Sequence, residues 1–284
     1  MTLTQQQLQA LPVFGIAGNF AEHLGQAGED ADFVDIQTEE ENAPKGMFPI
    51  YIPGNPTFLG TYPLSNQTIQ ADFSHPINLQ MEPEICVLFD VSYNEQKQVT
   101  QVEAKAFSAF NDCSIRRPNA KKISQKKNWG EACTGLSNQW IEIDRFEKGG
   151  ILDNYHIASY LKRGDEIKQY GVDSPVLGYN YFYQKLSQWI VKTLNSQSDF
   201  GPLENLTDLL KEANYPEQLI VTLGATRYTE FGETGFLKAD DQIGIFVYDQ
   251  SHHKASDIPN LFQHPEKIPE NFSGSALIQS VSED

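Results

Sequence analysis

Three acidic residues stand where predicted strands begin or end. Glu82 and Glu84 open the segment MEPEICVLFD at positions i and i+2. In a strand they project from one face, roughly 7 Å apart along the backbone. Asp112 ends the next predicted strand, so antiparallel pairing would bring it beside the first strand's start. Carboxylate oxygens of this kind suit Mg²⁺ or Mn²⁺, with Ca²⁺ as an alternative. The simpler interpretation is a pair of glutamates exposed at a strand end.

The segments that would position these carboxylates are mostly strands. Apolar or alternating patterns predict strands at 13–18, 84–92, 98–111, 218–225 and 241–249. Helical spacing and end signals predict helices within 4–10, 19–28, 180–195 and 202–213. Many strands and few helices indicate a β-rich α+β fold. The proline-rich and polar region after about residue 254 predicts a loosely packed C-terminal tail over 255–284.

Composition limits the function classes. The formal net charge of −17 argues against nucleic acid or an anionic membrane as a partner. No run of about 18 apolar residues is present, and the N-terminus lacks a signal-peptide pattern, so we expect a cytoplasmic protein. The three cysteines lack CxxC spacing, which favours structural thiols over a disulfide framework or a zinc site.

One segment departs from the acidic background. IRRPNAKKISQKK, residues 115–127, carries six Lys or Arg residues, whereas none precedes Lys45. This basic segment would neutralise an anionic ligand, or would simply be a solvated surface loop.

Five segments follow one another along the chain in a characteristic order: AGNFAEH (17–23), EPEICVLF (82–89), NDCSIRR (111–117), KNWGEACTG (127–135) and LIVTLGATRYTEFGETGFLKADDQIGIFV (219–247). This order of motifs resembles the fumarylacetoacetate hydrolase superfamily. The resemblance covers about residues 12–250. It implies a mixed β-roll or sandwich with a few flanking helices, in a single catalytic domain over 1–254. The N-terminal portion, about 1–65, would carry a lid helix.

The same resemblance implies roles for individual residues. Glu82, Glu84 and Asp112 match the family's metal-binding carboxylates. The matching catalytic residues are His23 on the lid helix, Lys127 beside the metal and Arg116. Arg116 also matches a substrate-binding position, and Gly224 and Thr226 belong to the matching glycine- and threonine-rich turn. These matches imply a metal-dependent enzyme that acts on a small 2-oxo acid or 1,3-diketone through an enolate. The chain would be a homodimer that binds a small anionic metabolite.

Several positions depart from the family pattern. Gly18 stands where an arginine is usual, and Arg117 and Gly130 stand where aspartates are usual. Gln26 stands where an acid usually follows the histidine. A general base would therefore be His23 with Glu22, with Glu29, or with neither. The alternative is a catalytically impaired relative that binds a metabolite or a partner.

Overall fold

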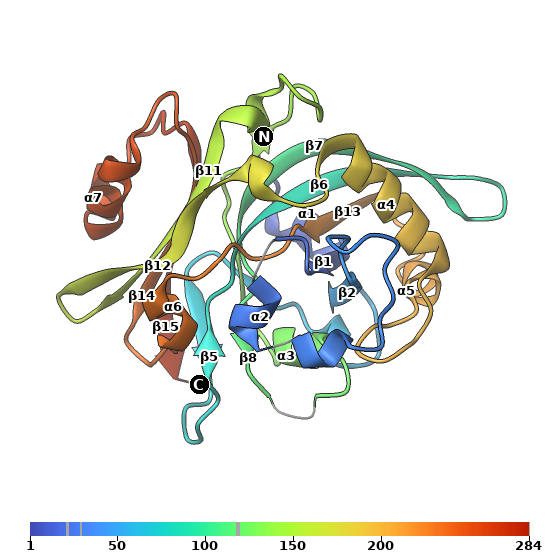
Figure 1. The fold of residues 1–284 in the computed structure, drawn as a ribbon, viewed down its shortest axis with the longest axis horizontal. Helices are drawn as coiled ribbons and strands as arrows, with labels where there is room; N and C mark the ends of the chain where they lie inside the picture. Colours follow the sequence, from blue (N-terminus) through green and yellow to red (C-terminus); the bar gives the residue numbers. More distant parts are fainter. Residues whose placement is uncertain (21–22, 29, 118–119, 284) are drawn as a thin grey trace.

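The computed structural model describes residues 1–20, 23–28, 30–117 and 120–283. Two β-sheets dominate it, with helices at their margins (Figure 1). The large sheet has the order β2-β1-β13-β6-β7-β9-β3, and β10 also pairs with β7. Its strands are β1 (Val13–Ala17), β2 (Gly46–Tyr51), β3 (Leu64–Ser65), β6 (Pro83–Tyr93), β7 (Val99–Asn111), β9 (Thr134–Leu136), β10 (Ile141–Glu142) and β13 (Gln218–Thr222). The predicted β-rich α+β class is confirmed.

The second sheet has the order β12-β11-β14-β15-β4. Its strands are β4 (Thr68–Ala71), β11 (Tyr155–Arg163), β12 (Glu166–Pro175), β14 (Gln242–Asp249) and β15 (Gly274–Glu283). A small ladder joins β5 (Leu79–Gln80) to β8 (Ser114–Ile115).

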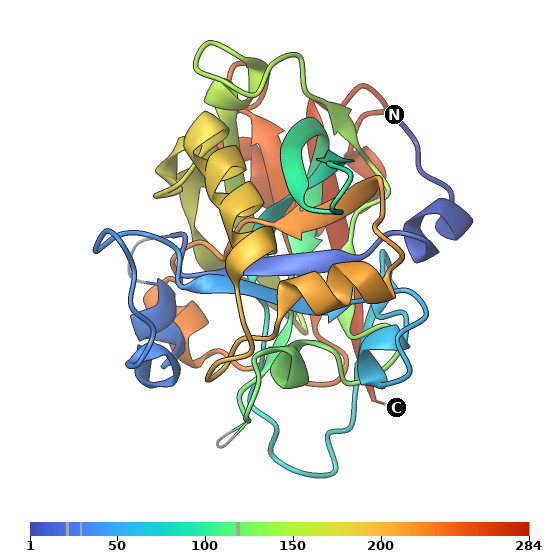
Figure 2. The same ribbon diagram turned by 90° about the vertical axis from the view of Figure 1, so that its right-hand side faces the viewer.

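The helices are short except for one. They are α1 (Gln5–Gln9), α2 (His23–Ala27), α3 (Ser124–Lys127), α4 (Tyr183–Ser196), α5 (Leu206–Glu212), α6 (Glu230–Thr234) and α7 (Ile258–Gln263). Figure 2 shows α4 and α5, in yellow and orange, side by side on one side of the molecule. In the described part of the chain, no helix is both long enough and apolar enough to cross a membrane.

The main core lies between the sheets, and the strand patterns explain how it is filled. In β6, Ile85, Val87 and Phe89 face the main core, while Cys86 and Leu88 join a second cluster on the opposite face. A strand buried on both faces needs a continuous apolar run, and β6 has one. The helix α4 adds the buried residues Leu186, Ile190 and Leu194 at helical spacing. The cysteines Cys86, Cys113 and Cys133 are buried free thiols, as expected.

The predicted loose tail over residues 255–284 is wrong. Strand β15 pairs with β14 on one side and with β4 on the other. Its Leu277 and Val281 are each 2 % exposed, and α7 covers the outer face of the sheet with buried Ile258 and Phe262. Ser and Gln make up four of the ten residues of β15, so the average composition of the region conceals a core strand.

This packing makes Leu277→Ala a destabilising change. Removing a buried leucine side chain leaves a cavity, and we expect the free energy of unfolding to fall by about 2–5 kcal/mol. Urea denaturation measures it, with Ser280→Ala, at an exposed position of the same strand, as the control. Equal stability of the two variants would show that β15 is not part of the core.

Candidate metal centre

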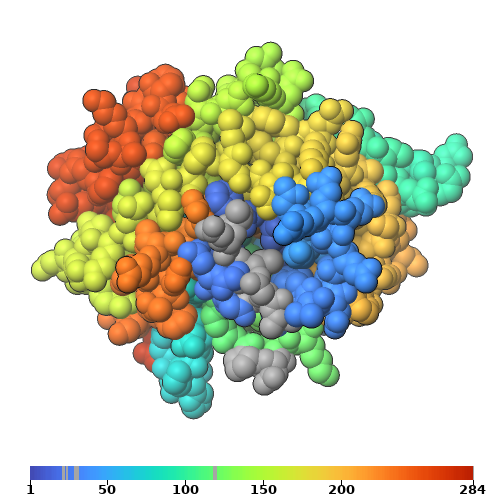
Figure 3. Space-filling view, in the orientation of Figure 1, coloured from blue at the N-terminus to red at the C-terminus, as the bar shows by residue number. Residues whose placement is uncertain are grey.

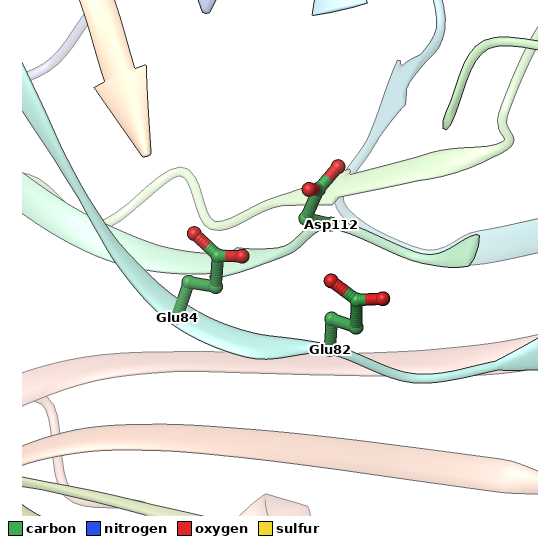
Figure 4. Close-up of side chains that lie close together, drawn as sticks. All are labelled: Glu82, Glu84 and Asp112. Carbon is green, nitrogen blue, oxygen red and sulfur yellow. The ribbon is translucent and has the colours of Figure 1, made fainter. Parts of the chain in front are cut away.

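The carboxylates of Glu82, Glu84 and Asp112 meet at one end of the β6–β7 hairpin. Pro83 pairs with Asn111, so Glu82 and Asp112 lie at the same end of the ladder. The Asp112 amide donates to the Glu82 carbonyl at 3.0 Å, which continues the ladder by one step. Figure 4 shows Glu82 and Glu84 rising from one strand toward Asp112 on its neighbour. One oxygen of each residue lies within 4.8 Å of the others.

Two cations contact this carboxylate cluster (Glu82, Glu84 and Asp112). Lys127, at the end of α3, places its Nζ 2.6 Å from Glu82 Oε2 and 2.9 Å from Asp112 Oδ2. Arg116 places Nη1 2.8 Å from the other Glu82 oxygen, Oε1. The three carboxylates and Lys127 are each at most 4 % exposed. Ion pairs in such surroundings are barely screened by solvent, so each charge strongly affects its neighbours.

The charges are unbalanced, and the pKa values reflect this. Burial alone would raise the pKa of Glu82, but the Lys127 ammonium and the Arg116 guanidinium outweigh it and hold that pKa well below its usual value. Burial and the negative charges of Asp112 and Glu82 raise the pKa of Glu84 well above its usual value. Three carboxylates face two cations, so full ionisation leaves one excess negative charge within this group. The unfavourable energy of that charge appears as the raised pKa of Glu84.

The donor set fits a hard divalent cation. Carboxylate oxygens are the ligands that Mg²⁺, Mn²⁺ and Ca²⁺ prefer. Oxygens that bind one such ion at about 2.0–2.6 Å lie at most about 5 Å apart, and the observed 4.8 Å satisfies this limit. A divalent ion would also neutralise the excess charge that raises the pKa of Glu84.

The turn after β13 supports Glu84. Gly224 donates its backbone N–H to Glu84 Oε2 at 2.8 Å. Its φ of 106° is in the range that favours glycine, and a Cβ there would lie 3.3 Å from the Ile16 carbonyl oxygen. Tyr179 holds the same turn by donating its hydroxyl to the Gly224 carbonyl at 2.8 Å. A glycine at this position therefore lets the backbone approach the carboxylate.

His23 is 6 % exposed and lies on α2 beside the cluster. Its Nδ1 is 3.0 Å from the Thr226 carbonyl oxygen, and its Nε2 is 3.8 Å from Glu82 Oε2. Since a carbonyl only accepts hydrogen bonds, Nδ1 carries the proton and Nε2 of a neutral ring keeps its lone pair. Glu22 and Glu29, the predicted alternative partners of this histidine, lie outside the described residues.

The sequence-predicted substrate-binding residues take different places. A narrow pocket is lined by His23, Lys127, the carboxylate cluster, Gly224 and, among others, Ile16, Asn19, Phe20, Phe48 and Ile123. The volume of the pocket is about 20 Å³, which is enough for one water molecule or ion. The Thr226 side chain is buried, and the Arg116 side chain is 11 % exposed; neither is among the residues that line this pocket.

Arg116 contacts several protein groups besides Glu82. Its Nε donates to Gln80 Oε1 at 2.7 Å, and its Nη2 donates to the Tyr228 hydroxyl at 3.2 Å. Tyr228 in turn donates that hydroxyl to the Met81 carbonyl at 3.0 Å. Gln80 and Tyr228 were not predicted from the sequence, because neither residue type signals a partner for an arginine that is distant in the chain.

The raised pKa of Glu84 predicts a pH-dependent metal affinity. A metal ligand must be ionised, so binding displaces the Glu84 proton at any pH below the raised pKa. We expect Mg²⁺ or Mn²⁺ affinity to rise with pH in that range, by up to about tenfold per pH unit for one proton. Calorimetric titrations at pH 5.5, 6.5 and 7.5 measure this dependence. An affinity that is constant across these values would contradict the raised pKa of Glu84.

A family model described as "Family of unknown function (DUF5718)" matches residues 29–281. No curated protein sequence matches the chain.

Solved structures match almost the whole fold. Cg1458 with inhibitor superposes with a TM-score of 0.53 at 16 % identity, covering 96 % of this chain and 77 % of that one. The structure of 2-keto-3-deoxy-D-arabinonate dehydratase, complexed with magnesium and 2,5-dioxopentanoate, superposes with a TM-score of 0.53 at 13 % identity. The match covers 100 % of this chain and 82 % of that one. Fumarylacetoacetate hydrolase from Exiguobacterium antarcticum superposes with a TM-score of 0.50 at 10 % identity. The match covers 96 % of this chain and 76 % of that one. At these identities the likeness establishes the fold. The chain therefore belongs to the family of unknown function DUF5718, and its fold is that of the fumarylacetoacetate hydrolase superfamily.

Proposed function

We propose that this protein is a divalent-metal-dependent enzyme acting on a small 2-oxo acid or 1,3-diketone. The observation that carries the proposal is the convergence of Glu82, Glu84 and Asp112 within 4.8 Å in a buried pocket with Lys127. Mg²⁺ or Mn²⁺ would be held by these three carboxylates, with Ca²⁺ as an alternative. A solved relative in fold binds magnesium together with 2,5-dioxopentanoate, a 2-oxo acid, which supports this substrate class.

Each neighbouring side chain has a part in the proposed chemistry. When bound, the metal supplies Lewis-acid stabilisation of an enolate. The Lys127 ammonium, which faces the same oxygens, adds positive charge beside the developing oxyanion. The Nε2 lone pair of His23 accepts a proton from water or from a substrate carbon. Arg116 holds Glu82 Oε1 at 2.8 Å and so orients a metal ligand.

The resemblance supports further features of the proposal. Gly224 lines the pocket and would contact the substrate through its backbone; Thr226 and Arg116 would complete the substrate site if the pocket widens on binding. C–C hydrolysis, decarboxylation, hydration and tautomerisation all pass through an enolate, so this set of residues serves each of them. We further propose a single catalytic domain, which includes β15 and therefore extends past residue 254, and a homodimer.

A second candidate is a protein that binds a metabolite without turning it over. Gln26, in the place of an acid, and Gly18, in the place of an arginine, favour it, since the Gln26 amide cannot act as a base and Gly18 has no side chain to bind an anion. This candidate predicts metal or ligand binding without product formation.

Turnover assays separate the two candidates. Purified protein with Mg²⁺ or Mn²⁺ is incubated with acetylpyruvate and with oxaloacetate, beside Asp112→Ala. The enzyme proposal expects product formation by the wild type that the variant loses. Metal binding by the wild type with no turnover of either compound would favour the binding protein.

A further inference from the structure

The helix α2 is attached to the segment 226–228 by two side chains on one face. His23 and Gln26 are three residues apart, which places them on the same side of a helix. The His23 ring bonds the Thr226 carbonyl through Nδ1 at 3.0 Å and packs against the Tyr228 ring at a centroid distance of 5.0 Å. Gln26 contacts the backbone of Tyr228 itself.

The Gln26 carboxamide binds both backbone groups of Tyr228. Its Oε1 accepts from the Tyr228 N–H at 2.8 Å, and its Nε2 donates to the Tyr228 carbonyl at 3.2 Å. The same Nε2 is 2.6 Å from Glu233 Oε1 on α6. Figure 3 shows the N-terminal segment, in blue, against the segment that contains α6, in orange. We call the set of contacts among Gln26, Tyr228 and Glu233 the α2 clamp.

Only a carboxamide can make all the bonds of the α2 clamp. Glutamine offers one acceptor oxygen and a donor NH₂ group, whereas an ionised glutamate only accepts. A glutamate here would set its carboxylate against the Tyr228 carbonyl and the Glu233 carboxylate. The acid usual in the related family is therefore incompatible with these contacts.

The α2 clamp decides what His23 presents to the pocket. With α2 docked, Nδ1 donates to the Thr226 carbonyl, and Nε2 lies 3.8 Å from Glu82 Oε2 in the pocket that both residues line. Nε2 is buried and has no hydrogen-bond partner among the described residues. A carbonyl holds the Nδ1–H tautomer without adding a negative charge beside the ring.

We propose that Gln26 is a positioning residue that holds α2 so that His23 directs Nε2 at the metal centre, with its tautomer set by the Thr226 carbonyl instead of a carboxylate. The role of His23 as a base rests on the proposed function, but the docking of α2 does not. The base would then be His23 without Glu22 or Glu29.

Hydrogen exchange tests the α2 clamp directly. At pH 7.5, Gln26→Glu is expected to speed hydrogen exchange of the peptide spanning α2 by at least about tenfold. A tenfold larger population of the open state corresponds to a decrease of about 1.4 kcal/mol in the free energy of local opening. Glu233→Gln is the matched control and should exchange like the wild type, since its amide oxygen still accepts from Gln26. The double variant Gln26→Glu with Glu233→Gln should recover part of the protection, because the new amide donates to the new carboxylate.

Nitrogen NMR of the His23 ring measures its tautomer, which would not change if Gln26 served only the stability of the fold. We expect the Nδ1–H tautomer in the wild type and a shift toward Nε2–H in Gln26→Glu. Unchanged exchange and an unchanged tautomer in that variant would overturn the proposal. If the wild-type protein shows the α2 clamp but no turnover, the proposed enzymatic function is refuted, while the role of Gln26 in docking α2 stands.

Discussion

Replacing Asp112 with asparagine is expected to weaken Mg²⁺ or Mn²⁺ binding by more than about 100-fold, because changes to outer-shell partners alone cost about 10–100-fold. The substitution keeps the size of the side chain and removes one of the three charges that meet within 4.8 Å. Turnover of a 2-oxo acid should be lost with it. Calorimetric titration of the metal into wild type and variant measures the affinity.

The control for Asp112→Asn is Glu103→Gln on the same strand. Glu103 lies in β7 with a side chain 60 % exposed, so its loss changes the net charge equally without touching the cluster. Metal affinity of this control should match that of the wild type. If both variants weakened binding equally, the metal would be attracted only by overall charge.

Replacing Lys127 with methionine is expected to destabilise the metal-free protein by about 3–5 kcal/mol, the cost of removing one partner of a buried ion pair. The Lys127 ammonium lies within 2.9 Å of both Glu82 and Asp112, so its loss leaves these carboxylates to repel one another and Glu84. A divalent ion would replace that charge. Adding Mg²⁺ should therefore stabilise Lys127→Met more than the wild type, as measured by urea denaturation with EDTA or with metal.

Lys126→Met provides the matched control. Lys126 is the neighbour of Lys127 on α3, but its Nζ pairs at 2.6 Å with Asp32, whose side chain is 36 % exposed. Its loss should affect stability equally with and without metal. If the destabilisation of Lys127→Met were also independent of metal, Lys127 and the cation would not share the same carboxylates.

The carboxylate cluster was predictable because it depends on local rules. The i, i+2 spacing places Glu82 and Glu84 on one face, and a simple hairpin between β6 and β7 brings Asp112 to the same end. The helix α4 was predictable for the same reason, since Leu186, Ile190 and Leu194 repeat at helical spacing.

Features that depend on distant segments were not predictable. The strand β15 reads as polar because Ser and Gln make up four of its ten residues. The hairpin of β11 and β12 was not predicted, because charged residues surround its turn and weaken the alternating pattern. The bonds of Gln26 to Tyr228 join residues 202 positions apart, and no spacing rule connects them.

The basic segment 115–127 illustrates the same limit. By composition it predicts either an anion-binding loop or a solvated one. Lys122 bonds Asp199 and the Leu203 carbonyl, at 2.9 and 2.7 Å. Lys126 and Lys127 are buried and paired with acids. Much of the positive charge of the segment is therefore used within the protein.

The most direct test of the account is anomalous X-ray scattering from crystals of the wild-type protein soaked with Mn²⁺. The account predicts one strong anomalous peak per chain, bound by oxygens of Glu82, Glu84 and Asp112, with the Lys127 ammonium displaced from at least one of them. Well-occupied Mn²⁺ elsewhere, with Lys127 still bridging Glu82 and Asp112, would contradict it.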